Sequence, residues 1–251
     1  MKPTERFSDR VENYVKYRPH YPPEIIPFLK KEIGLMPSSI IADIGSGTGI
    51  SSELLLRNGN TVYGIEPNKE MREAGEELLR DYPKFHSITG TAENTTLPDA
   101  GIDLIVAGQA FHWFDVAKAR IEFKRILKPG GWVVLIWNER LLDTTPFLIS
   151  YEHLLHSFGT DYAEVQHKNV KGDIGTLFTE KGYRLEHFPN SQSCDFGGLQ
   201  GRLLSSSYIP TPDSPKYRPM IEDLQKIFDE NEKEGEVEIL YMTEVYYGQI
   251  I

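Results

Sequence analysis

The first half of the chain alternates short apolar runs with segments in which apolar residues recur at helical spacing. The runs at 39–43, 61–66, 85–91, 102–107 and 132–137 predict five strands. Residues 50–57 and the segments after Asn68 and Asp115 predict helices, with these two side chains as N-terminal caps. We expect residues 128–131 (KPGG) to end the third helix and turn into the fifth strand.

Strands that alternate with helices predict a parallel sheet with right-handed crossovers. The uninterrupted apolar runs at 102–107 and 132–137 indicate strands covered on both faces. The last third is less regular, with a helical stretch near 140–157, strands at 183–189 and 236–247, and a proline-rich stretch between those strands. We therefore expect an α/β fold. Its doubly wound, mostly parallel seven-stranded sheet should carry helices on both faces, an antiparallel C-terminal hairpin and a helical lid or insertion.

Composition narrows the class of protein. The chain has 27 Lys and Arg against 37 Asp and Glu, a net charge of −10, and such a surface disfavours nucleic acid as a partner. Cys194 is the only cysteine, so neither an internal disulfide nor a thiolate metal site is expected. The N-terminus does not resemble a signal peptide, and no run approaches ~20 apolar residues, the length of a membrane span. These features predict a cytoplasmic protein without a membrane segment.

The strand at 39–43 runs into a glycine-rich turn, Asp43-Ile44-Gly45-Ser46-Gly47-Thr48-Gly49. Glycines allow a tight turn and a close approach of backbone to a ligand, and the next helix offers free N–H groups. Position 50 is Ile, so the third glycine of the dinucleotide pattern G-x-G-x-x-G is missing, and no phosphate-binding lysine follows. Glu66 ends the next strand, where a carboxylate can accept hydrogen bonds from both ribose hydroxyls of an adenosine.

Several segments together resemble the class I S-adenosylmethionine-dependent methyltransferases, specifically their small-molecule branch. These segments are IADIGSGTG, GIEPN, GTAENTTLPDAGIDLIVAGQAFHWFD and FKRILKPGGWVVL, in that order. The stretch FSDRVENYVKYRPHYP is similar to an N-terminal lid segment in relatives of trans-aconitate methyltransferase. The resemblance covers roughly residues 5–140 and implies S-adenosylmethionine as the cofactor.

The resemblance also implies which residues contact the cofactor. The glycine turn would lie along the methionine part, with Gln109 near the sulfonium, and Glu66 would hold the ribose. Arg18 would pair with the cofactor carboxylate, and Thr91 stands where many relatives carry the Asp that contacts adenine. The full implied set is Tyr14, Arg18, Asp43, Gly45, Ser46, Gly47, Glu66, Pro67, Asn68, Thr91, Ala92, Glu93 and Gln109.

Methyl transfer from a sulfonium is an in-line displacement, so the protein must chiefly align the reactants and exclude water. A general base is needed only for an acceptor that arrives protonated. His112, Trp113 and Asn138 follow the fourth and fifth strands, where the acceptor pocket should open. His112 is the candidate base, although a packed histidine beside Trp113 is the favoured interpretation. The histidines do not repeat in a metal-binding pattern, so no metal is expected.

We expect one domain over residues 1–251. It divides into N-terminal lid helices (1–35), a cofactor-binding core (36–140), a helical acceptor-side insertion with one strand (141–235) and a C-terminal strand (236–251). The predicted activity is methyl transfer to a small-molecule acceptor, with a carboxylic acid as one candidate, by a monomer or weak homodimer. Two alternatives stay open: an NAD-dependent oxidoreductase, and a protein that binds S-adenosylmethionine without turnover.

Overall fold

A computed structural model of the chain describes residues 16–160, 162, 170–178, 182–206 and 208–250. It contains one seven-stranded sheet in the order β3-β2-β1-β4-β5-β7-β6. The strands are β1 (Ile40–Ile44), β2 (Thr61–Ile65), β3 (Phe85–Ile88), β4 (Ile102–Gly108), β5 (Leu127–Arg140), β6 (Tyr183–Cys194) and β7 (Val237–Gly248). β1 to β5 pair in parallel, whereas β7 pairs antiparallel with both β5 and β6. This arrangement confirms the predicted fold class.

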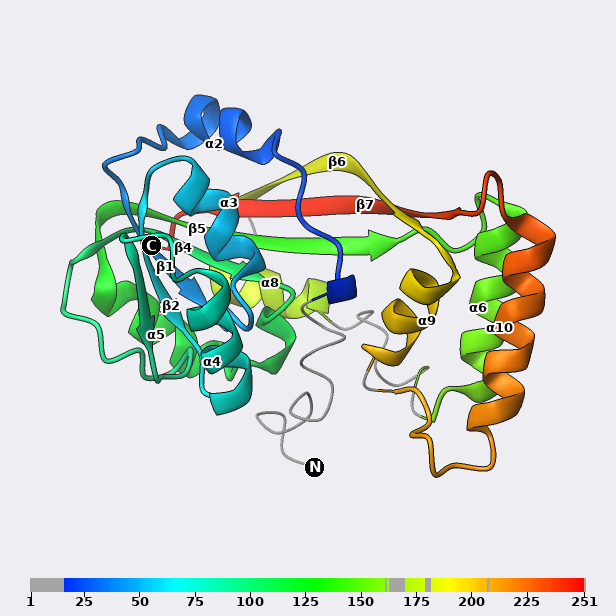
Figure 1. Cartoon of the computed structure of the whole chain (residues 1–251). Helices are drawn as coiled ribbons and strands as arrows, with labels where there is room; N and C mark the ends of the chain where they lie inside the picture. The colour runs from blue at the N-terminus through cyan, green and yellow to red at the C-terminus, as the bar shows by residue number, and fades with distance from the viewer. Residues whose placement is uncertain (1–15, 161, 163–169, 179–181, 207, 251) are drawn as a thin grey trace.

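The helices fall on both faces of the sheet and in a separate group at the far ends of β6 and β7 (Figure 1). They are α2 (Ile25–Ile33), α3 (Ile50–Arg57), α4 (Lys69–Leu78), the 3-10 turn η3 (Phe111–Trp113), α5 (Val116–Ile126), α6 (Pro146–Phe158), α8 (Val170–Phe178), α9 (Phe196–Leu204) and α10 (Tyr217–Asn231). Among the described residues, no helix is long and apolar enough to span a bilayer.

Alternate residues of the central strands enter two different hydrophobic cores. In β4, Ile105 packs with α5 and α8, whereas Leu104 and Val106 pack with α2 and α3 on the other face. β5 repeats the pattern, with Val133 and Val134 on opposite faces. Two covered faces explain why these strands read as continuous apolar runs in the sequence.

The polar residues predicted to cap helices do so. The Asn68 side chain accepts a hydrogen bond from the Met71 amide at 2.9 Å and begins α4. The Asp115 carboxylate accepts from the Lys118 amide at 3.2 Å and begins α5. Each cap satisfies a backbone N–H that has no partner within the first helical turn.

Three boundaries differ from the sequence prediction. Residues 128–131 do not form a turn between helix and strand, because β5 begins at Leu127 and accommodates Gly130 at a φ of 81° near a register shift against β4. β3 ends at Ile88 rather than at position 91. β6 continues beyond the predicted end at position 189 to Cys194, and it pairs antiparallel with β7 along its whole length, with α9 and α10 between the two strands in sequence.

The third hydrophobic core lies in what we call the helical lobe: α6, α9, α10 and the far ends of β6 and β7. Its buried residues include Leu148, Leu203, Leu224 and Ile239. α8 falls within the same stretch of sequence as these helices but packs instead on α5, with Leu177 in the sheet's own core. The strands β5, β6 and β7 run outward from the sheet toward the lobe (Figure 1).

Residues 16–24, which we call the strap, run between the sheet and the helical lobe (Figure 1). The Asn138 and Asn190 side chains both donate to the His20 carbonyl oxygen, at 3.3 and 2.8 Å. The Gln192 side chain donates to the Tyr17 carbonyl oxygen at 2.9 Å. Tyr17 also packs on Gly201 of α9, so closely that a Cβ there would lie 2.0 Å from its ring. The strap is thus fastened to β5, β6 and α9.

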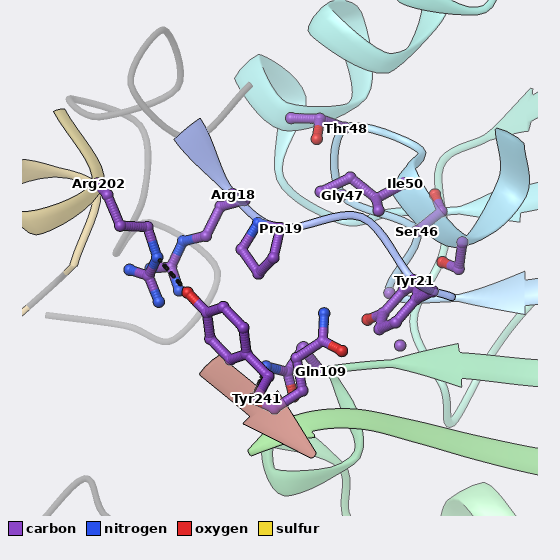
Figure 2. Close-up of a pocket in the computed structure, with 14 residues that line it drawn as sticks. Arg18, Pro19, Tyr21, Ser46, Gly47, Thr48, Ile50, Gln109, Arg202 and Tyr241 are labelled. Carbon is purple, nitrogen blue, oxygen red and sulfur yellow. Dashed lines mark hydrogen bonds between the residues drawn. The ribbon is translucent and has the colours of Figure 1, made fainter. Parts of the chain in front are cut away.

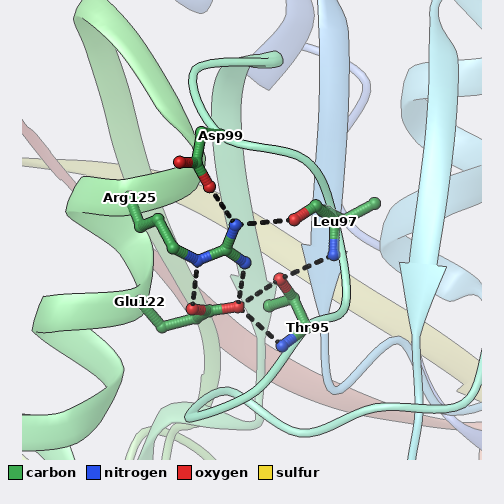
Figure 3. Close-up of polar contacts among 5 residues, drawn as sticks. All are labelled: Thr95, Leu97, Asp99, Glu122 and Arg125. Carbon is green, nitrogen blue, oxygen red and sulfur yellow. Dashed lines mark hydrogen bonds and ion pairs between the residues drawn. The ribbon is translucent and has the colours of Figure 1, made fainter.

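A buried carboxylate ties the loop before β4 to α5 (Figure 3). The Glu122 oxygen Oε1 accepts from the Thr95 amide and hydroxyl at 2.8 and 2.6 Å, and both carboxylate oxygens accept from the Arg125 guanidinium. Arg125 also donates to the Leu97 carbonyl and to Asp99. The Arg125 guanidinium and the Thr95 donors lower the pKa of Glu122 to about 2, against the penalty of burial.

Glu122→Gln should lower the free energy of unfolding by about 1–3 kcal/mol, the value of charged hydrogen bonds in a partly buried site. The folded-state pKa lies below the ordinary value of 4.5, so the carboxylate's contribution should be present above pH 4.5 and vanish toward pH 2. Urea denaturation checks the loss at neutral pH. The exposed pair partner Glu222 on α10 provides the control, since Glu222→Gln should change stability by less than about 0.5 kcal/mol.

Candidate functional site

A cleft opens at the carboxyl ends of β1 and β4, where ligands bind in open parallel sheets (Figure 2). Its walls come from the strap, the turn after β1, the end of β4, and the helical lobe. Six residues singled out from the sequence line it: Arg18, Gly45, Ser46, Gly47, Gln109 and Asn138. The non-atom space in the cleft is about 500 Å³, which includes space open to solvent.

The turn after β1 is built from glycines in the left-handed region. Gly45, Gly47 and Gly49 have φ values of 69°, 54° and 91°, which L side chains rarely adopt. A Cβ on Gly45 would lie 2.6 Å from the Ala110 side chain, and one on Gly49 would lie 2.5 Å from Leu79. These two glycines are therefore required by packing within the protein as well as by the turn.

Glu66 connects the end of β2 to the glycine turn. Its Oε2 accepts from the Gly47 amide at 2.9 Å, and its Oε1 accepts from the Asn68 amide at 2.8 Å. The side chain is nearly fully buried, and burial raises its pKa above the ordinary value even though the two amide donors act in the opposite direction. Each carboxylate oxygen keeps a lone pair beyond these bonds, so Glu66 can hold the turn and still accept from a ligand.

Asp43 is fully buried at the end of β1. Its Oδ2 accepts from the hydroxyls of Ser51 and Ser52, at 2.7 and 2.6 Å, in the first turn of α3. Its Oδ1 is buried and accepts from no described residue. Burial raises the pKa of Asp43 to about 6, although the serine hydroxyls favour the ionised form.

Gln109 directly follows β4, Asn138 lies near the end of β5, and both line the cleft, but their side-chain amides have different hydrogen-bond partners. Gln109 has a φ of 53° and a buried Oε1 without a hydrogen-bond partner among the described residues. The Asn138 Oδ1 accepts from Thr243 at 2.5 Å and from Asn190 at 3.2 Å, while its Nδ2 donates to the strap. Asn138 therefore helps to fasten the strap across β5, β7 and β6.

Asp43, Glu66 and the remaining predicted site residues are not among those that line the cleft. Pro67 and Asn68 follow Glu66, and Asn68 is occupied as the cap of α4. Residues 91–93 form a tight turn, with Thr91 bridged to Asn94 and Ala92 buried, and the Glu93 carboxylate accepts from the Asp115 amide at 2.8 Å. Tyr14 lies outside the described residues.

His112 and Trp113 form part of η3, with ring centroids 4.5 Å apart, and neither lines the cleft. This placement offers no support for the candidate general base or for Trp113 as a pocket wall. It agrees with the interpretation of His112 as a packed side chain. Among the described residues, no group of three or more His, Cys, Asp or Glu side chains could hold a metal ion.

Sequence reasoning missed several residues of the cleft, notably Tyr21, Thr48, Arg202 and Tyr241. Tyr21 lies in the quoted strap sequence, and its hydroxyl would lie 2.6 Å from a Cβ on Gly108, so close packing explains that glycine. Thr48 lies in the quoted glycine turn and keeps a buried hydroxyl without a described partner. Arg202 and Tyr241 come from α9 and β7, where no sequence motif marks them.

The residues of the cleft fit S-adenosylmethionine. Thr48 Oγ1 and Gln109 Oε1 in the lining, and Asp43 Oδ1 at the end of β1 just before the lining turn, are buried acceptors that no described residue satisfies. A buried acceptor requires a donor. The ammonium group in the methionine part of the cofactor carries three N–H donors, which could satisfy these acceptors. Gly47 has no side chain to block the adjacent backbone, and a Cβ there would meet only Met71 Cε, at 3.3 Å. The Glu66 carboxylate lies on the other side of the same turn.

Comparisons with known proteins agree with this geometry. Residues 42–135 match the family model described as a methyltransferase domain. An uncharacterized methyltransferase of Geobacillus sp. (strain WCH70) is 36% identical over 158 residues, which cover 59% of this chain and 70% of that protein. An uncharacterized methyltransferase of Schizosaccharomyces pombe is 26% identical over 245 residues, or 97% of this chain and 96% of the relative.

Solved structures show the same fold. A proposed type II methyltransferase from Anaeromyxobacter dehalogenans superposes with a TM-score of 0.69 at 19% identity, covering 94% of this chain and 99% of that one. A SAM-dependent methyltransferase from Aquifex aeolicus gives 0.50 at 19% identity over 78% of this chain and 93% of that one. With its glycine turn, acidic β2 end and antiparallel β7, the chain belongs to the class I S-adenosylmethionine-dependent methyltransferases.

Proposed function

We propose that the chain binds S-adenosylmethionine along the glycine turn and methylates a small molecule, with a carboxylic acid as the leading acceptor class. The observation that carries this proposal is the set of three unsatisfied acceptor oxygens, on Asp43, Thr48 and Gln109, grouped at the carboxyl ends of β1 and β4. A cationic amino-acid moiety bound along the glycine turn would supply the donors that they lack. The acidic net charge of the whole chain favours a small acceptor over a nucleic acid.

Each part of the site would have a distinct task. When bound, the cofactor supplies the methyl group and the positively charged sulfonium that makes it transferable. Asp43 and Gln109 would orient the methionine end, and Glu66 would accept from the ribose hydroxyls while it holds the Gly47 amide. The turn at residues 91–93 would border the adenine. Tyr21 and the strap would cover the reacting atoms and keep water out.

The two alternative functions are separable by experiment. A nicotinamide-dependent oxidoreductase should bind NADH, and a silent binding protein should bind S-adenosylmethionine without releasing S-adenosylhomocysteine. A screen of small metabolites that measures S-adenosylhomocysteine release, followed by mass analysis of the product, tests methyl transfer and names the acceptor. If the protein binds the cofactor tightly but releases no S-adenosylhomocysteine with any acceptor of a broad panel, the silent binding protein is favoured.

Glu66→Ala should weaken S-adenosylmethionine binding by about 1–3 kcal/mol, because it removes charged hydrogen-bond acceptors from the ribose and frees the Gly47 amide. Glu66→Gln should fall between wild type and Glu66→Ala, since it keeps one acceptor oxygen. Isothermal titration calorimetry measures both, with NADH as the competing ligand. Glu73→Ala, an exposed change on α4, is the control. Wild-type affinity in Glu66→Ala would remove Glu66 from the site.

Binding of S-adenosylmethionine should strengthen as the pH rises from 5 to 7. Burial raises the pKa of Asp43 from the ordinary value of 3.8 to about 6 in the folded protein. Without a ligand, the free energy of unfolding should therefore decrease as the pH rises from 3.8 to about 6. A cationic ligand beside Asp43 favours the ionised form, so its affinity should fall roughly tenfold from pH 7 to pH 5. Asp43→Asn should bind more weakly and flatten this dependence. An equally steep profile in Asp43→Asn would assign the titration to another group.

A further inference from the structure

Arg202 is a buried cation at the end of the cleft formed by the helical lobe (Figure 2). Its Nε donates to the Tyr241 hydroxyl and its Nη1 donates to the Ser206 hydroxyl, both at 3.3 Å. Its electrostatic neighbours are three tyrosines, at positions 151, 208 and 241. Among the described residues, no carboxylate lies within ion-pair distance of its guanidinium, and its Nη2 donates to none of them.

A second buried arginine, Arg140 at the end of β5, has a carboxylate partner. Its guanidinium pairs with Glu152 of α6, and its Nη2 also donates to the Tyr162 hydroxyl at 3.0 Å. The same contrast holds at the other end of the sheet, where Arg125 pairs with Glu122 and Asp99. A buried charge without a partner is strongly destabilising. Arg202 is therefore a positive charge that no carboxylate of the described residues neutralises.

Arg202 comes from a different part of the fold than the oxygens that we assign to the cofactor ammonium. It projects from α9 of the helical lobe, whereas the unsatisfied oxygens of Asp43, Thr48 and Gln109 lie at the ends of β1 and β4. In Figure 2, Arg18 and Pro19 of the strap lie between Arg202 and the glycine turn. A ligand group bound to Arg202 would thus lie on the helical-lobe side of these strap residues, across the cleft from the glycine turn.

We propose that Arg202 binds an oxyanion of the methyl acceptor, a carboxylate or a phosphate group, and thereby restricts the enzyme to anionic acceptors. The guanidinium offers a planar fork of donors, and within the described part of the chain two of them are engaged, each by a neutral hydroxyl at 3.3 Å. Tyr241 is nearly fully buried, and its hydroxyl fixes the guanidinium beside the cleft. This assignment rests on the proposed function, because it presumes that the cleft receives a methyl acceptor.

The test compares acceptors that differ only in charge. Wild type, Arg202→Gln and Arg202→Lys are assayed for S-adenosylhomocysteine release with mono-, di- and tricarboxylic acids, their methyl esters and amides, and phosphate monoesters. With the best anionic acceptor, Arg202→Gln should lose roughly 10- to 100-fold in kcat/KM, chiefly through KM, because charge-assisted hydrogen bonds are lost. Arg202→Lys should lose less. Whichever of the carboxylates or phosphates responds identifies the oxyanion.

Two measurements keep a structural effect apart from recognition. S-adenosylmethionine affinity by calorimetry should stay within about twofold of wild type in both variants, and uncharged esters and amides should lose less than about threefold. Arg218→Gln removes an exposed charge from α10 of the same lobe and should behave as wild type. The thermal midpoints of both variants are measured first. If Arg202→Gln is unstable, the comparison of charged with uncharged acceptors is made with Arg202→Lys.

Several outcomes would overturn the inference while leaving methyl transfer intact. They are equal losses for charged and uncharged acceptors, weaker cofactor binding with unchanged acceptor preference, and wild-type turnover restricted to uncharged acceptors. The proposed function fails in a different way, namely if wild type neither binds S-adenosylmethionine nor releases S-adenosylhomocysteine with any acceptor of either charge.

Discussion

The hydrogen bond from the Gly47 amide to the Glu66 carboxylate is the contact on which the site depends. It joins the turn after β1 to the end of β2, and the Gly45 and Ser46 amides add bonds of 2.8 and 3.2 Å to the Ile65 carbonyl oxygen. Without these bonds, a turn with three glycines at positive φ would have many other conformations available. With them, bare backbone is held open between two buried carboxylates, Asp43 and Glu66.

The remaining parts of the cleft are brought to this turn by packing. Gly45 admits Ala110 from the loop after β4, so the turn and Gln109 lie at the same edge of the sheet. The strap crosses that edge because Asn138, Asn190 and Gln192 donate to its carbonyl groups. The helical lobe then contributes Arg202 and Tyr241 from the opposite side. The sheet thus supplies the groups suited to a cofactor, whereas the lobe supplies the charge that we assign to the acceptor.

The sequence predicted those features that depend on residues close together along the chain. Apolar runs covered on both faces, the caps at Asn68 and Asp115, and the glycine turn are all legible within a few residues of sequence. The prediction for residues 128–131 was wrong because glycine and proline were taken as a turn, while pairing with β4 carries the backbone through them as an irregular strand. Arg202 and Tyr241 were missed because only the pairing of β6 with β7 and the packing of α9 bring them to the cleft.

A crystal structure of the chain with S-adenosylhomocysteine would show whether the glycine turn binds the cofactor. We expect the ribose hydroxyls within hydrogen-bond distance of Glu66, the ammonium beside Asp43 and Gln109, and the sulfur facing the part of the cleft that ends at Arg202. A ligand bound elsewhere, or a glycine turn filled by protein side chains in the complex, would contradict this assignment.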